Sequence, residues 1–535
     1  MSGFTGTRGL SRLVLRRDRW ILPFWVVIPG LAAGNFVVAS EELYPTAADQ
    51  KEYVATTATN PAFLALFGPI HSADIGGIVA QRLGFAPVII ALISVLTVMR
   101  HTRTEEERGR RELLAATAVG RKAGLAAALM VTLAANLLLA VVIAVSVTGR
   151  GQDSAGAWAL GLSIASAGIV FAGVAALAAQ LTQTAGAARG LSLSVLGAAF
   201  AVRLAGDVGG QGNSVEWLTW LSPLGWTQRV RPFADERWWV LLLPLAAIVV
   251  LATVASRMVG RRDIGEGVLP PRPGPATASS GLNGPLGLAW RLHRGPLLGW
   301  TAGFLAMGAV FGGVAEGAGE LLGDNKDLSE IFSRMGGASG LTDAYLAAMM
   351  GLIGLVAAAY GIQAALRLRT EETEQRAEPL LATAVRRLRW ASGHLLFALV
   401  GPIVGLTAAG LAAGLVHGLN VSDVGGQVPR VLGGALVQLP AVWLLAAVAV
   451  AVFGVLPRFT AAVAWTVLSL CVLFGQFGAA LKLNQSLLDL SPFTHIPKLP
   501  GGDASATDLI WLLLLAAALV VAGLAGLRRR DLPVP

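Results

Sequence analysis

The stretch AGLAAALMVTLAANLLLAVVIAVSVT, residues 123–148, contains no charged residue. It is long enough to cross the hydrocarbon core of a bilayer, which takes about 20 apolar residues. The whole sequence has the same character, since 55% of its 535 residues are hydrophobic and 14% are charged, whereas ordinary soluble domains carry about 25% charged residues. These proportions exclude a soluble globular protein and predict an all-α, polytopic membrane protein.

Apolar segments of spanning length recur along the chain, and we predict twelve of them. The first six cover residues 21–40, 84–99, 123–148, 156–180, 187–203 and 238–256. The second six cover residues 296–315, 346–366, 393–416, 431–456, 460–480 and 508–527. The first of these runs lacks a convincing cleavage site for a signal peptidase, so we expect a retained helix rather than a signal peptide.

The distribution of charge between the predicted spans indicates the orientation in the membrane. When both termini are placed in the cytoplasm, most of the 41 Lys and Arg residues fall on the inside, as the positive-inside rule requires. We therefore predict a multi-pass protein of a bacterial cytoplasmic membrane with cytoplasmic termini. Orientation also explains the net charge of +9, so no nucleic-acid partner is expected. The single cysteine, Cys471, cannot form an intrachain disulfide.

One cytoplasmic loop occurs twice. The segment RTEEERGRRELLAATAVGR, residues 103–121, aligns with RTEETEQRAEPLLATAVRR, residues 369–387, and most positions are identical. The pair Ser222-Pro223 recurs in the same order as Ser491-Pro492. The chain is therefore predicted to consist of two fused six-helix halves in the same orientation, which is a parallel repeat. We assign the halves to residues 1–262 and 287–535, with a cytoplasmic linker over 263–286 that is rich in Pro, Gly, Ala and Ser.

The repeated loop mixes carboxylates and guanidiniums in a fixed order, which suits a short helix at the membrane surface. One interpretation is that the loop only retains positive charge inside and caps the spans. Charge retention does not require the order Arg-Thr-Glu-Glu followed by a further Glu and Leu, however. A duplicated pattern of both signs favours docking onto a partner that is itself present in two copies.

The segment that runs from Arg108 through Leu114 to Arg121 resembles the first intracellular loop of type V ABC exporter permeases. In those permeases the loop forms a coupling helix that contacts the ATPase. The layout resembles the fused permeases of actinobacterial exporters of polyketide antibiotics, the tetronasin type. This resemblance implies two copies of a P-loop ABC ATPase as partners. It also implies the following ATPase-coupling residues: Glu105, Glu106, Arg108, Gly109, Glu112, Leu114, Arg121, Glu371, Glu372, Glu378, Leu380 and Arg387. In the second copy Gln375 replaces the glycine and Pro379 interrupts the run, so coupling there is expected to differ.

The chain has no P-loop, since the sequence contains no Gly-Lys dipeptide. Its six histidines are scattered without the spacing of metal ligands. We therefore predict a transport subunit that is not itself an enzyme and that needs no cofactor or metal in this chain. ATP and magnesium are expected on the partner ATPase.

The energy for transport could come from ATP hydrolysis or from an ion gradient. Ion-driven transporters keep ionisable groups at membrane depth, whereas the charged residues here fall at the ends of the predicted spans, which favours ATP hydrolysis on a docked partner. An ion-coupled twelve-helix drug or lipid transporter stays open, with Asp207 and Glu316 as its best candidates for a titratable group. A membrane scaffold or sensor that uses the loops to bind a regulatory protein is a third hypothesis.

The resemblance also implies an outer gate just outside the fifth span of each half. It further implies a substrate cavity between the two halves, where the second and fifth spans of each half face one another. The gate candidates are Trp217, Trp220, Ser222, Pro223, Trp226, Ser491 and Pro492. The cavity candidates are Phe85, Phe200, Met349, Tyr360, Gln363, Phe474, Gln476 and Phe477. Aromatic and methionine walls suit a hydrophobic or amphipathic substrate. An aromatic belt at the membrane interface and ordinary helix packing are the alternative readings.

Overall fold

The computed structural model describes residues 3–58, 61–115, 117–207, 214–263, 265–269, 276–277, 280–282, 284–323, 340–477, 484, 488–502 and 506–531. Within these ranges all the regular secondary structure is helical, and no strand occurs. Twelve of its helices are long and apolar enough to cross a membrane. The prediction of an all-α, polytopic membrane protein with about twelve spans is confirmed.

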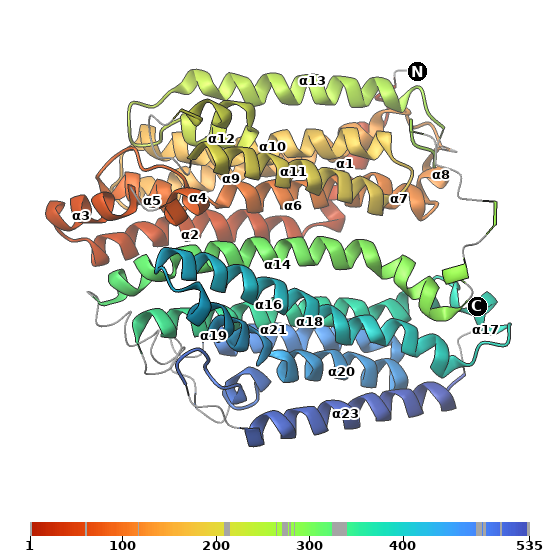
Figure 1. Cartoon of the computed structure of the whole chain (residues 1–535). Helices are drawn as coiled ribbons and strands as arrows, with labels where there is room; N and C mark the ends of the chain where they lie inside the picture. Colours follow the sequence, from red (N-terminus) through yellow and green to blue (C-terminus); the bar gives the residue numbers. More distant parts are fainter. Residues whose placement is uncertain are drawn as a thin grey trace. The chain divides into compact units, whose positions relative to one another are not determined.

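The chain divides into two compact units, Met1–Gly274 and Pro275–Pro535. Unit 1 contains six spans (Figure 1). These are α2 (Ile21–Leu43), α6 (Ala86–His101), α9 (Ala123–Thr148), α10 (Ser154–Leu181), α11 (Ala185–Asp207) and α13 (Leu242–Val259). Unit 2 also contains six, in α14 (Pro285–Gly323), α16 (Leu341–Thr373), α18 (Arg387–Asn420), α19 (Val424–Leu436) with α20 (Leu439–Val455), α21 (Thr460–Phe477) and α23 (Ala506–Arg529).

The two units share one internal packing pattern. In unit 1 the fourth span, α10, packs against α6, α9, α11 and α13, which are the second, third, fifth and sixth spans. In unit 2 the fourth span, α20, packs against the corresponding helices α16, α18, α21 and α23. Small residues permit this close packing, since a Cβ added to Gly161 of α10 or to Gly454 of α20 would meet the backbone of a neighbouring helix.

The first spans differ between the units. In unit 1 a separate helix, α1 (Thr7–Arg17), precedes α2, and the chain breaks between them at Asp18. The Oδ2 of Asp18 forms a hydrogen bond of 2.5 Å with Nε2 of His101. In unit 2 the corresponding stretch is one helix, α14, that begins at Pro285, well before the predicted start at residue 296. Unit 1 also inserts α3 (Ala47–Ala58), α4 (Pro61–Phe67) and α5 (Ile75–Arg82) between its first and second spans.

The repeated loop lies at one end of each unit, which we call the motif end. In unit 1 it forms α7 (Arg103–Glu107) and α8 (Arg110–Ala115), near the N terminus (Figure 1). In unit 2 the Arg-Thr-Glu-Glu sequence continues α16, and α17 (Ala377–Leu381) follows near the C terminus. The prediction of short helices in this loop therefore agrees with the structure, although in unit 2 part of the loop is an extension of the span.

Candidate functional site

The residue at the turn inside the repeated loop has a left-handed backbone conformation in both units. Gly109 lies between α7 and α8 with φ of 67°, and Gln375 lies between α16 and α17 with φ of 58°. Both values are in the left-handed region, which glycine adopts at little cost and other residues adopt at a cost of about 1–2 kcal/mol. The loss of glycine in the second copy therefore adds backbone strain without changing the turn.

We expect Gln375→Gly to stabilise the protein and Gly109→Gln to destabilise it. The side chain of Gln375 is exposed, and a Cβ at Gly109 would meet no atom within 4 Å, so relief or addition of backbone strain is the main change. After the greater entropy of a glycine in the unfolded chain is subtracted, a net effect of about 0.5–1 kcal/mol remains. That amounts to roughly 1–2 °C in the melting temperature, upward for Gln375→Gly and downward for Gly109→Gln, in a thermal-shift assay of the detergent-purified chain. Shifts of the same sign in both variants would contradict the account.

A glutamate of the repeated loop is fastened to the end of the sixth span in each unit. In unit 1 the Nη2 of Arg262, just after α13, donates to Glu106 Oε1 at 2.8 Å and to Oε2 at 3.0 Å. In unit 2 the guanidinium of Arg530, just after α23, donates to both carboxylate oxygens of Glu372 at 2.6 Å. All four side chains are largely buried, with at most 14% exposed. Charge-assisted pairs of this kind are among the stronger hydrogen bonds in proteins.

The far end of the repeated loop is fastened to the same place. Arg121 Nη2 donates to the backbone carbonyl of Arg262 at 2.5 Å, and Arg387 Nη1 donates to the backbone carbonyl of Arg530 at 2.6 Å. We call each set the arginine clamp: Glu106, Arg121 and Arg262 in unit 1, and Glu372, Arg387 and Arg530 in unit 2. The clamp therefore joins both ends of the loop to the end of the sixth span.

The clamps differ in how much positive charge surrounds the glutamate. Glu106 is also paired with Arg103 and Arg111. Within the described part of the chain Glu372 is paired with Arg530 alone, because Ala377 takes the place of Arg111 in the sequence repeat. Unit 1 therefore gathers three guanidiniums on one carboxylate where unit 2 uses one.

The first glutamate of each motif is also held within its unit. Glu105 pairs with Arg17 at 2.9 Å and Arg110 at 3.2 Å. The buried Glu371 pairs with Arg367 at 2.7 Å. Both carboxylates are therefore paired inside their own unit, and a coupling role for them stays a prediction.

The remaining predicted coupling residues face outward or stand at the turn. Arg108, Glu112 and Glu378 are exposed, and Leu380 is half-buried. Leu113, which the sequence analysis did not select, is 75% exposed. The side chain of Leu114 lies outside the described residues. Glu112 and Leu113 of α8 thus lie side by side in the sequence and are both exposed.

Sequence reasoning missed Arg262 and Arg530, although a signal for them exists. Arg261-Arg262-Asp263 recurs as Arg529-Arg530-Asp531 directly after the sixth span of each half. Arginines at that point are also what the positive-inside rule demands, so their sequence gives no reason to expect a specific partner. Only the structure brings them to the repeated loop.

The predicted outer-gate segment of unit 1 forms a turn of 3-10 helix over Glu216–Leu221 and the short helix α12 (Pro223–Arg229). This segment lies at the end of unit 1 opposite the motif end (Figure 1). Ser222 Oγ donates to the carbonyl of Ala199 in α11 at 2.7 Å, and Trp226 Nε1 donates to the carbonyl of Trp220 at 2.6 Å. The segment is thus fixed to the fifth span, while Trp217 is exposed.

The corresponding segment of unit 2 contains Ser491, which is buried, and Pro492, which begins a 3-10 turn over Pro492–His495. Each unit therefore presents a Ser-Pro pair at the start of a short helical turn. An outer-gate function for either segment stays a prediction.

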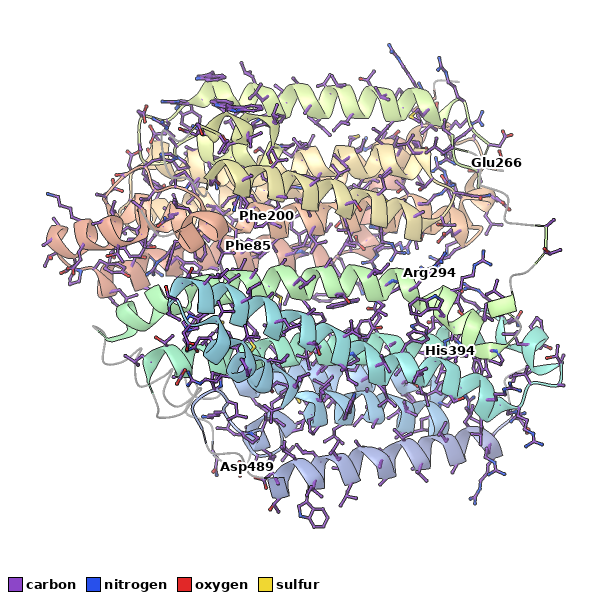
Figure 2. All side chains as sticks on the ribbon, viewed as in Figure 1. Phe85, Phe200, Glu266, Arg294, His394 and Asp489 are labelled. Carbon is purple, nitrogen blue, oxygen red and sulfur yellow. The ribbon has the colours of Figure 1, made fainter. Side chains whose placement is uncertain are left out.

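The structure joins some of the cavity candidates within each unit. In unit 1 the rings of Phe85 and Phe200 lie edge to face with centroids 5.9 Å apart (Figure 2). In unit 2 Trp300 joins two candidates, because its ring lies 5.9 Å from that of Tyr360 and its Nε1 donates to Gln363 at 2.8 Å. Met349 and Phe474 are half-buried, and the side chains of Gln476 and Phe477 lie outside the described residues. Substrate contact stays a prediction for all eight residues.

Asp207, one candidate for ion coupling, lies at the end of α11 in an ion pair with the buried Arg203, whose Nε is 3.5 Å from its carboxylate. Arg203 also donates to the carbonyl of Leu66 at 3.2 Å and lies over the ring of Phe200. The side chain of the second candidate, Glu316, lies outside the described residues. Through Arg203, this ion pair links α11 to α4, and an ion-coupling role for Asp207 stays a prediction.

Comparison with known protein families finds the same duplication in the sequence. A single family profile, described as the C-terminal domain of the multidrug efflux system permease Rv1217c, matches residues 12–258 and again residues 282–528. The chain belongs to this family of multidrug efflux permeases. The permease is also 46% identical over 531 residues to the multidrug efflux system permease protein Rv1217c of Mycobacterium tuberculosis (strain ATCC 25618 / H37Rv). That alignment covers 99% of this chain and 96% of the mycobacterial protein. The permease is accordingly a multi-pass membrane protein and a transport subunit.

Proposed function

We propose that this permease forms the membrane part of an ATP-driven ABC exporter, with two copies of a P-loop ATPase docked at the motif ends of its two units. ATP and magnesium are bound by the ATPase. Both termini and both repeated loops then lie in the cytoplasm. The observation that carries the proposal is the duplicated arginine clamp, since each unit ties its repeated loop to its sixth span by the same two kinds of contact.

The clamp supplies a mechanical reason for the duplication. A loop that only retained positive charge inside would not need its glutamate buried against an arginine at the end of another helix. A partner that moved α8 or α17 would, through the clamp, move the end of α13 or α23 as well. ATP-driven movement of the docked ATPases would thereby reach the transmembrane helices, and alternating access would follow as a rigid-body motion.

The substrate class follows from the family and from the apolar interior. The name of the mycobacterial relative specifies multidrug efflux, and the cavity candidates are largely aromatic. We propose hydrophobic or amphipathic compounds as substrates. Within that class, the resemblance of the sequence to tetronasin-type exporters makes polyketide antibiotics a narrower proposal to examine.

Transport into inside-out vesicles from native membranes tests the energy source. Uptake of ethidium that depends on this chain is expected to require ATP and to continue when a protonophore collapses the ion gradients while ATP is held constant. The Asp207→Asn variant should retain ATP-dependent uptake. Vesicles without the chain are the control.

Two results would favour the other hypotheses. Uptake that stops with the protonophore at constant ATP, and that fails in Asp207→Asn, would favour an ion-coupled transporter. No chain-dependent uptake under any condition would favour a membrane scaffold or sensor.

A further inference from the structure

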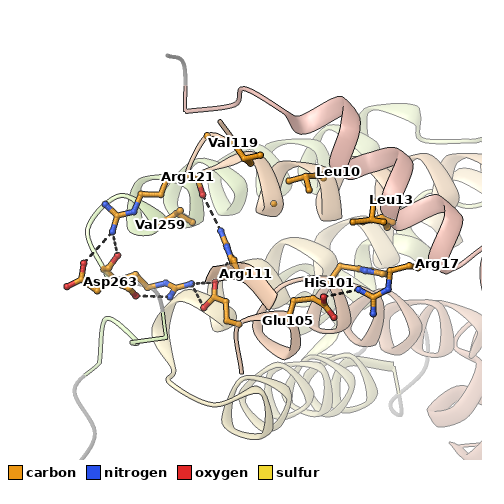
Figure 3. Close-up of a pocket in the computed structure, with 16 residues that line it drawn as sticks. Leu10, Leu13, Arg17, His101, Glu105, Arg111, Val119, Arg121, Val259 and Asp263 are labelled. Atoms are coloured by element: carbon orange, nitrogen blue, oxygen red, sulfur yellow. Dashed lines mark hydrogen bonds and ion pairs between the residues drawn. The ribbon is translucent and has the colours of Figure 1, made fainter. Parts of the chain in front are cut away.

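Unit 1 contains a cavity of about 480 Å³ at its motif end (Figure 3). It lies between α1, α9, the end of α13 and the repeated loop. The proposed coupling mechanism does not need a cavity at this place. Its walls therefore call for a separate explanation.

The lining has two chemically different sides. Helix α1 contributes the aliphatic side chains of Leu10, Leu13 and Val14, and Ala127 and Val259 extend this apolar surface. The other side carries charged groups of the repeated loop and its neighbours: Arg17, Glu105, Glu106, Arg111, Arg121, Arg262 and Asp263. A cavity with an aliphatic side and a charged side suits an amphiphile.

The charged side contains more positive charge than the clamp requires. Glu106 is shared by Arg103, Arg111 and Arg262. In unit 2 the corresponding Glu372 is paired, within the described residues, with Arg530 alone. Arg111 is therefore an addition peculiar to unit 1.

Arg111 is held in a fixed position next to the cavity. One of its nitrogens contacts Glu106, and Nη2 donates to the carbonyl of Arg121 at 3.2 Å. Burial lowers the pKa of Arg111, and the carboxylate of Glu106 opposes that effect. Holding extra guanidinium charge away from water is costly unless an anion compensates it.

The surroundings of α1 indicate where such an anion would come from. Leu13 is 44% exposed, and Trp20 and Phe24, at the start of α2, are 78% and 69% exposed. Large apolar side chains exposed beside a span face lipid, and tryptophan marks the level of the headgroups. In a membrane, lipid headgroups at the level of Trp20 would lie beside α1, which forms one wall of the cavity.

We propose that this cavity binds one anionic phospholipid, with its phosphate beside Arg111 and an acyl chain along Leu10, Leu13 and Val259. The lipid would neutralise the surplus guanidinium charge of unit 1 and would fill the space beneath α1. The site does not depend on the ATP-driven mechanism.

Native mass spectrometry of the full-length chain tests the site. The chain is purified in mild detergent, delipidated, and incubated with an equimolar mixture of phosphatidylglycerol and phosphatidylcholine. One phosphatidylglycerol per chain is expected to remain bound. Arg111→Ala, which removes the surplus charge, and Ala127→Phe, which fills the apolar side, should each lower that occupancy by about tenfold, the equivalent of one strong charge-assisted contact.

Each variant has a matched control. Arg110→Ala removes the same charge from the neighbouring residue of α8, which does not line the cavity. Leu133→Phe enlarges an exposed side chain on the same helix as Ala127. Both controls should retain phosphatidylglycerol, and all variants should elute as single monodisperse species.

Three results would overturn the proposal: equal retention of the two lipids, unchanged phosphatidylglycerol in both Arg111→Ala and Ala127→Phe, or equal loss in Arg110→Ala and Arg111→Ala. Inorganic phosphate is added in a parallel sample. Displacement of the bound lipid by phosphate at equal concentration would show a site for free anions and would also overturn it.

Discussion

Reversing one charge of the Arg530–Glu372 pair is expected to uncouple transport, and reversing both is expected to restore it. The pair is largely buried, and Glu372 has no other ion-pair partner in the described chain. Arg530→Glu or Glu372→Arg alone would place two like charges in contact. Breaking a buried pair costs about 3–5 kcal/mol, and because this pair is partly exposed we expect about 3 kcal/mol. The melting temperature should fall by roughly 3–6 °C.

The charge-exchanged double variant distinguishes a specific clamp from general damage. Arg530→Glu with Glu372→Arg recreates an ion pair in the same place, so most of the lost stability and ATP-dependent ethidium uptake should return. A double-mutant cycle on the melting temperatures measures the coupling between the two residues. Additive effects, with no recovery in the double variant, would show that the clamp does not act as a pair.

The second large effect is expected on the outer face of α8. Glu112→Lys combined with Leu113→Asp changes an exposed carboxylate and an apolar side chain that is 75% exposed. Neither change touches the clamp, so the melting temperature should stay within about 1 °C, as for ordinary surface substitutions. The ATPase docked at unit 1 should be lost, so that copurified ATPase falls from two copies per chain to one, and ATP-dependent uptake should fall by about tenfold or more, because the centre of a docking surface carries most of its binding energy.

Glu42→Lys is the matched control for that experiment. It reverses an exposed carboxylate near the end of α2, at the opposite end of unit 1 from the repeated loop. Full ATPase copurification with the Glu112→Lys and Leu113→Asp variant would remove the outer face of α8 as the docking surface. A loss of the same size in Glu42→Lys would show that overall charge, and not this face, governs the interaction.

Hydropathy predicted the spans well where charge marks both ends. The predicted segment 123–148 coincides with α9 (Ala123–Thr148), which lies between Lys122 and Arg150. The same method began the seventh span at residue 296, whereas α14 begins at Pro285. Its first turns contain Arg291 and Arg294, so they are helical without being apolar, and a hydropathy pattern cannot detect them.

The repeat was readable from sequence, but the direction in which its side chains point was not. The sequence alone does not distinguish the charged residues of the motif that are buried from those that are exposed. The structure turns Glu106, Glu371 and Glu372 inward, because each meets an arginine of its own unit. One of those contacts joins Glu106 to Arg262 across a large separation in the chain, which no local pattern reveals.

The packing of small residues explains why two sequences of limited similarity form the same bundle. The fourth span of each unit contacts four other spans; the buried residues of α10 are mostly alanine and glycine, and those of α20 are mostly alanine, valine and leucine. Such packing depends on size at each contact more than on identity. The long apolar stretches of the two units have therefore diverged further than the repeated loops.

The most direct test of the central claim is the composition of the complex. The unaltered protein and the variant with Glu112→Lys and Leu113→Asp are each extracted from the native membrane in mild detergent. The mass of each complex is then measured by native mass spectrometry. One permease chain with two copies of a single P-loop ATPase is the expected result for the unaltered protein, with one of the two copies lost from the variant. A chain that is reproducibly recovered without any ATPase would contradict an ATP-driven exporter and would return attention to Asp207 and Glu316.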